Sequence, residues 1–96
     1  MARFVTILGK TWQLIYPLRI GKKDHRGLCD SPHRKHPKIR VKRSLRGEER
    51  LEIYIHEMLH AAGWHLDEGY VTDFSADLAR ELWELGYRNI TVETNG

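Results

Sequence analysis

Two histidines and one glutamate in residues 48–67 (EERLEIYIHEMLHAAGWHLD) have the types and spacing that metal-assisted hydrolysis requires. They form the pattern His56-Glu57-Met58-Leu59-His60, or HExxH. Residues four apart project from one side of an α-helix, so His56 and His60 can place two imidazole nitrogens about 2.0–2.1 Å from one ion. Glu57 lies one position further round the helix, where it can deprotonate a zinc-bound water without being a ligand.

The surroundings of the motif predict a helix that ends just after it. The apolar positions predict a stripe that faces the core: Leu51, Ile55, Leu59 and Ala62. The polar positions predict an adjacent stripe: Glu49, Glu52, His56 and His60. Gly63 follows as a left-handed C-terminal residue. Zn²⁺ is the expected cofactor, although the same ligands accept other divalent ions. The alternative is a structural helix whose polar edge carries these residues without a metal.

A catalytic zinc site takes three protein ligands, so one further donor is expected after the helix. The candidates are His65, Asp67, Glu68, Asp73 and Asp77. In the pattern HExxHxxGxxH a third histidine occupies the position that Leu66 holds here. We therefore favour Glu68, in the first turn of a second helix, with His65 next. Glu68 can equally compensate the helix N-terminus without any metal.

Composition indicates one globular domain over residues 1–96, with 41% apolar residues and a single cysteine, so no disulfide framework. No segment has the length of a membrane span, and residues 4–8 are too short for a signal-peptide core, so we expect a cytoplasmic protein. So small a domain has little wall for a substrate cleft, and an oligomer or larger assembly is a possible active form.

Basic residues are concentrated in the middle of the chain. Residues 19–50, from Arg19 to Arg50, contain 12 of the 16 lysines and arginines, interspersed with His25, His33 and His36. Such a segment can contact nucleic acid or an acidic partner, or be a solvated loop surface. It supports an alternative function, a non-catalytic zinc-stabilised module that binds nucleic acid or protein.

Before the motif, periodicity predicts a hairpin of residues 4–8 and 11–20, with the second strand at an edge because Pro17 cannot donate to a ladder. Residues 21–37 have no apolar period and predict a loop. Residues 38–42 (KIRVK) predict a strand with Ile39 and Val41 inward, which an extended peptide substrate can join as an added strand.

After the motif, a second helix is expected from Asp67 to Gly86, and residues 89–93 can form a short strand. The face of this helix that packs on the first one is predicted from its apolar positions: Val71, Phe74, Leu78, Leu82 and Leu85. The expected fold class is α+β, with a three- to four-stranded sheet packed on the HExxH helix and a second, C-terminal helix.

Residues 27–87 resemble a family, the small zincin-fold metallopeptidase domains of the SprT-like type or the compact HExxH proteins of phages and bacteria. The resemblance rests on these segments: GLCDSP at 27–32, KIRVK, RSLRG, LEIYIHEMLHAAGW and DEGYVTDFSADLARELWELGY. It implies zinc ligands at His56, His60 and Glu68, with Glu57 as base. We therefore expect a zinc-dependent metallopeptidase that hydrolyses peptide bonds in a peptide or protein substrate. The candidate donors to the oxyanion are Tyr54, Tyr70 and the many histidines and arginines, among which the sequence does not choose.

Overall fold

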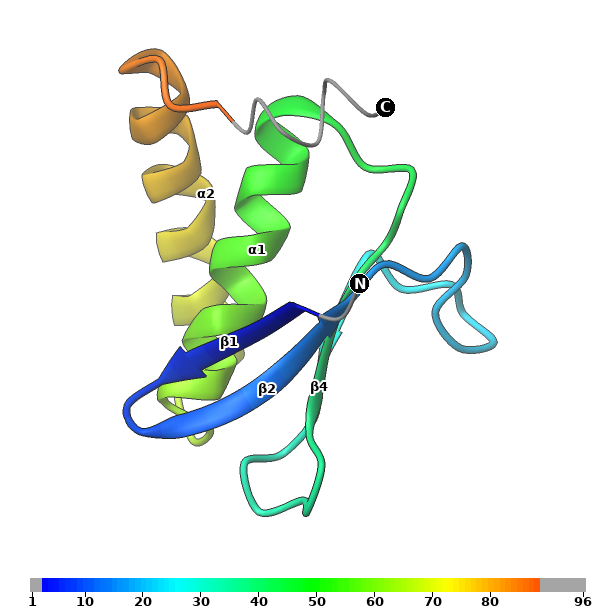
Figure 1. Ribbon diagram of the computed structural model, residues 1–96. Helices are drawn as coiled ribbons and strands as arrows, with labels where there is room; N and C mark the ends of the chain where they lie inside the picture. Colours follow the sequence, from blue (N-terminus) through cyan, green and yellow to red (C-terminus); the bar gives the residue numbers. More distant parts are fainter. Residues whose placement is uncertain (1–2, 89–96) are drawn as a thin grey trace.

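Four strands form one mixed sheet in the computed structural model, which describes residues 3–88 (Figure 1). The strands are β1 (Arg3–Ile7), β2 (Lys10–Ile15), β3 (Gly27–Cys29) and β4 (Lys38–Val41). Their order in space is β1-β2-β4-β3, with β2 and β4 parallel and the other two pairs antiparallel. Within residues 3–88 the two edge strands of the sheet are therefore β1 and β3.

The predicted N-terminal hairpin is confirmed, but its second strand is not an edge strand. Leu8 and Gly9 join β1 to β2 in a turn with positive φ at both residues, 49° and 80°. Such angles match the right-handed twist of the two strands. β2 ends at Ile15, so Pro17 lies outside the ladder and β2 can be flanked by β1 and β4. The proline ends pairing here and does not define an edge.

The segment 21–37, predicted to be a loop, contains β3. Leu28 pairs with Arg40 of β4, and Cys29 pairs with Ile39. A strand of three residues is too short to show a period in the sequence, and only its pairing with β4 reveals it. The inward orientation of Ile39 and Val41 is confirmed, because both are fully buried.

Both predicted helices are present, within about one residue of the expected starts and ends. They are α1 (Gly47–Ala62) and α2 (Glu68–Glu84). In the described part of the chain, α2 contacts α1 and none of the strands, whereas α1 also contacts β1, β3 and β4. The helix α1 is therefore a middle layer between the sheet and α2 (Figure 1).

The core-facing stripe predicted for α1 is wrong in register. The buried positions are Arg50, Ile53, Glu57 and Ala61. The predicted residues Leu51, Ile55 and Leu59 are half-buried, and Ala62 is exposed. A helix with neighbours on two sides distributes its apolar positions between them, so no single stripe describes it. The consequence for the site is that Glu57 lies against the sheet and not at its margin.

The predicted packing face of α2 also needs correction. Small residues take the central positions: Val71, Ser75 and Ala79 are buried. Phe74 and Leu85 are exposed instead. Because α2 has a single neighbour and small side chains bring that neighbour close, only a narrow stripe of its surface is covered.

The α+β class is confirmed by this mixed sheet and its two helices. The predicted strand 89–93 lies outside the described residues. Neither α1 nor α2 is long and apolar enough to cross a membrane.

Candidate metal centre

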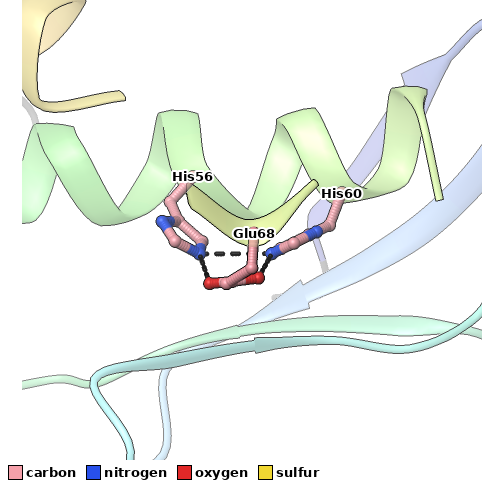
Figure 2. A group of neighbouring side chains, drawn as sticks. All are labelled: His56, His60 and Glu68. Atoms are coloured by element: carbon pink, nitrogen blue, oxygen red, sulfur yellow. Dashed lines mark hydrogen bonds and ion pairs between the residues drawn. The ribbon is translucent and has the colours of Figure 1, made fainter. Parts of the chain in front are cut away.

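Three side chains from α1 and α2 converge on one point (Figure 2). His56 and His60 stand one turn apart on α1, and their Nε2 atoms are 3.2 Å apart. Glu68 is the first residue of α2, and its Oε1 lies 3.0 Å from His56 Nε2. Its Oε2 lies 3.0 Å from His60 Nε2. The sequence therefore predicted correctly which acidic residue would meet the two histidines, although its role as a ligand stays a prediction.

A short, well-ordered connection brings Glu68 to this point. The backbone N–H of Gly63 donates to Leu59 at 2.8 Å and ends α1. Asp67 then caps α2, its carboxylate accepting from the N–H of Tyr70 at 3.0 Å. Glu68 is thereby fixed as the first helical residue, where its side chain can reach back along α1.

Gly63 does not adopt the left-handed conformation that its position predicts. Its φ is −139°, an extended value that other residues can adopt. Glycine is needed here for space, because a Cβ atom would lie 2.7 Å from Cγ of Leu66. Leu66 folds back over the end of the helix, and this contact replaces the expected turn.

The spacing of the three ligand atoms fits a single metal ion. Ligands at 2.0–2.1 Å from a tetrahedral zinc ion are about 3.3 Å apart. The two Nε2 atoms are 3.2 Å apart, which is close to that value, and each lies 3.0 Å from a different oxygen of Glu68. One ligand atom from each of the three residues lies within 4.8 Å of the others. Two imidazoles and a carboxylate are a donor set that suits zinc and other divalent transition metals.

Glu57 is buried next to these ligands, with an exposed fraction of 6%. Burial in apolar surroundings, and secondly the charge of Glu68, raise the pKa of Glu57 to about 7 from its ordinary 4.5. The close approach of β3 creates this environment: a Cβ atom at Gly27 would lie 2.8 Å from Oε2 of Glu57 and 2.6 Å from Cγ2 of Ile53. A carboxylate with a pKa near neutrality is well suited to accept and return a proton.

The chain was compared with protein-family models, with curated protein sequences and with solved structures. None of them matches. The resemblance to small zincin-fold domains therefore stays a prediction, and the chemistry of the site rests on the geometry of its own residues.

The other candidates for the third ligand lie away from the cluster. His65 is exposed in the connection between the helices, and Asp67 is engaged as the cap of α2. Asp73 is exposed, and Asp77 forms an ion pair with Arg80 at 3.2 Å. Within residues 3–88, the group of metal-ligating side chains that converges closely is the one containing Glu68.

Neither tyrosine proposed as an oxyanion donor lines the pocket at the metal centre. Tyr54 is hydrogen-bonded to the hydroxyl of Tyr16, and burial raises the pKa of Tyr54. Tyr70 stacks on Phe74 on the outer side of α2, with 6.0 Å between ring centroids. Oxyanion stabilisation by either hydroxyl is therefore not supported by their positions.

The strand proposed to pair with a substrate, residues 38–42, has no open edge at which a peptide could be added. β4, which covers the predicted strand 38–42, is flanked by β2 on one side and β3 on the other. Arg40, expected to face solvent or substrate, forms an ion pair with Asp30 at 3.0 Å. The strand with a free edge near the metal centre is β3.

The residues that the sequence did not indicate are those that enclose the site. A pocket of about 460 Å³ contains the three candidate ligands and Glu57. Its walls come from Gly27 and Cys29 of β3 and from Trp64 and Leu66 after α1. The only sequence signal for β3 is the apolar pair Leu28-Cys29 beside Gly27, which is too weak to predict a strand.

Proposed function

We propose that this chain is a zinc-dependent metallopeptidase with His56, His60 and Glu68 as metal ligands and Glu57 as general base. One observation carries the proposal. The Nε2 atoms of His56 and His60 lie 3.2 Å apart and each lies 3.0 Å from one oxygen of Glu68, and a buried carboxylate opens into the same pocket. A purely structural helix edge has no need for a buried glutamate beside converging imidazoles.

Each residue has a distinct part in the proposed hydrolysis. A zinc ion in this donor set polarises a carbonyl group and makes water acidic near neutral pH. Glu57 accepts the proton from the attacking water and transfers it to the leaving nitrogen of the amide. Its burial beneath β3 keeps the carboxylate close to the pocket and limits its contact with bulk water. Glu68, whose two oxygens face the Nε2 atoms of His56 and His60, would supply the third ligand oxygen.

The free edge of β3 is the proposed seat of an extended substrate. In the ladder between β3 and β4, Asp30 N–H donates to Lys38 at 2.9 Å and Lys42 N–H donates to Arg26 at 2.8 Å. Backbone groups of an antiparallel strand alternate in direction, so those of Gly27 and Cys29 point away from β4. A peptide that pairs with these groups passes directly over Glu57 and the ligands.

The test combines metal content with cleavage of fluorescently labelled casein by the purified chain. We expect one zinc per chain in wild type and in Glu57→Gln, and a loss of zinc in His60→Ala. Of these three proteins only the wild type should cleave casein, because Glu57→Gln keeps the ligands but removes the base. Glu84→Gln is the control, since Glu84 is exposed at the far end of α2. Cleavage by Glu57→Gln, or absence of zinc from the wild type, contradicts the proposal.

A second candidate function is the zinc-stabilised binding module, and a separate observation favours it. The loop between β3 and β4 presents four exposed residues with basic side chains: His33, Arg34, Lys35 and His36. Among the ion pairs within residues 3–88, none involves any of these four side chains. If this loop binds phosphate groups, the chain should bind a DNA duplex. The affinity should fall steeply with salt and should weaken when Arg34 and Lys35 are changed to alanine. Unchanged binding in that double variant excludes the loop as the contact surface.

A further inference from the structure

The pocket at the metal centre combines a polar floor with one apolar wall. The wall consists of Trp64 and Leu66, which follow α1 and remain 37% and 40% exposed, and Leu28 of β3, 41% exposed, adds apolar surface to the lining. Large apolar side chains that stay half open beside polar ligands are a common feature of small-molecule sites. A volume of about 460 Å³ is large enough for a substrate side chain in addition to the reacting amide.

The wall is held in place by local contacts and not by the rest of the core. The N–H of Leu66 donates to the carbonyl of Gly63 at 2.9 Å, which closes a turn directly after α1. The side chain of Leu66 occupies the space that a Cβ atom at Gly63 would need. Leu66 is therefore positioned by the turn that follows α1, whatever the sequence of the substrate.

The wall of Trp64 and Leu66 offers no charged partner to an acidic group. The titratable lining of the pocket consists of two carboxylates, two imidazoles and the thiol of Cys29, and no lysine or arginine lines it. With the metal ion occupied by the reacting amide, an acidic side chain seated against Trp64 and Leu66 finds no cationic side chain to pair with among the described residues that line the pocket. Transferring a carboxylate into such a site is unfavourable.

The geometry points to a substrate with a large apolar side chain beside the scissile bond, seated against Trp64 and Leu66. This specificity rests on the proposed function, because the wall acts only on a substrate held at the metal centre. Trp64 and Leu66 are assigned as specificity-determining residues. Peptides with aspartate or glutamate at the same position are expected to be poor substrates.

Three hydroxamates that bind zinc through the same group test the assignment by direct binding to the zinc-loaded chain. The probes are acetohydroxamate, 4-methylpentanohydroxamate and succinic monohydroxamate, and the last two differ by an isopropyl group in place of a carboxylate. Calorimetry should show the apolar probe binding about tenfold tighter than acetohydroxamate, the effect of removing about two methylene-sized groups from water. The carboxylate probe should bind no tighter than acetohydroxamate.

Two variants test whether Trp64 and Leu66 cause the preference for the apolar probe over acetohydroxamate. Leu66→Asn and Trp64→Gln, each with its zinc content measured, should reduce the tenfold preference to about threefold or less. Leu18→Asn is the matched control, because Leu18 is an exposed leucine outside the pocket. Equal binding of all three probes, or an unchanged preference in both wall variants, overturns the assignment and leaves the metallopeptidase proposal intact. A chain that binds neither zinc nor acetohydroxamate overturns the metallopeptidase proposal, and the assignment with it.

Discussion

The burial of Glu57 predicts that the metal-free protein loses stability as pH rises and that Glu57→Gln does not share this loss. The pKa of Glu57 is about 7 in the folded chain, against an ordinary value of 4.5. Because the folded-state pKa is the higher one, the folded state binds the proton more tightly. The contribution to stability is therefore fully present below about pH 4.5 and is lost as pH rises through about 7.

The size of this loss of stability follows from the pKa values of Glu57 in the folded and unfolded chain. Each pH unit between them corresponds to 1.36 kcal/mol, so ionised Glu57 lowers the free energy of unfolding by about 3 kcal/mol at high pH. Between pH 5 and pH 8 the stability difference between Glu57→Gln and wild type should grow by about 2.5 kcal/mol in favour of the variant. This change exceeds the usual extrapolation error of a denaturant measurement on a small domain.

The assay is urea unfolding in the presence of a chelator at several values between pH 5 and pH 8. The wild type and Glu57→Gln contain the same other titratable groups, so the difference between the two curves isolates Glu57. Glu84→Gln, which changes an exposed carboxylate, should follow the wild type at every pH. Parallel curves for wild type and Glu57→Gln would refute the burial of this side chain beneath β3.

Three further substitutions test how the site is built, each by urea unfolding at one pH. Gly27→Ala should destabilise the fold by about 1–3 kcal/mol, because its Cβ would lie 2.6 Å from Cγ2 of Ile53; an unchanged midpoint would contradict the close approach of β3. Asp67→Ala should cost about 1 kcal/mol and weaken zinc affinity, since the cap that fixes Glu68 is lost. Ser75→Ala should stabilise by about 1 kcal/mol, because the fully buried Ser75 hydroxyl has no hydrogen-bond partner within residues 3–88.

The parts predicted correctly from the sequence are those set by local chemistry. The HExxH spacing alone places His56 and His60 on one side of a helix, and the cap at Asp67 fixes where Glu68 begins the next one. The α+β class, both helices and the N-terminal hairpin follow from periodicity and turn residues in the same way.

The parts predicted wrongly depend on neighbours that the sequence does not reveal. β4 is an inner strand only because β3, three residues long, pairs with its outer side. Phe74 is exposed because α2 has one neighbour, which the apolar pattern of α2 cannot show. The burial of Glu57 likewise requires the approach of Gly27 from a distant part of the chain.

The proposed metal ligands lie close together in the sequence as well as in space, and this has a consequence for folding kinetics. His56 and Glu68 are 12 positions apart, within one helix pair. By contrast, β2 and β4 pair only after the chain between residues 15 and 38 has closed on itself. Short loops close with less loss of entropy, so zinc can bind the pair α1 and α2 before the sheet is complete. Zinc should then increase the refolding rate in stopped-flow experiments. An ion that binds only the finished fold would instead lower the unfolding rate and leave the refolding rate unchanged.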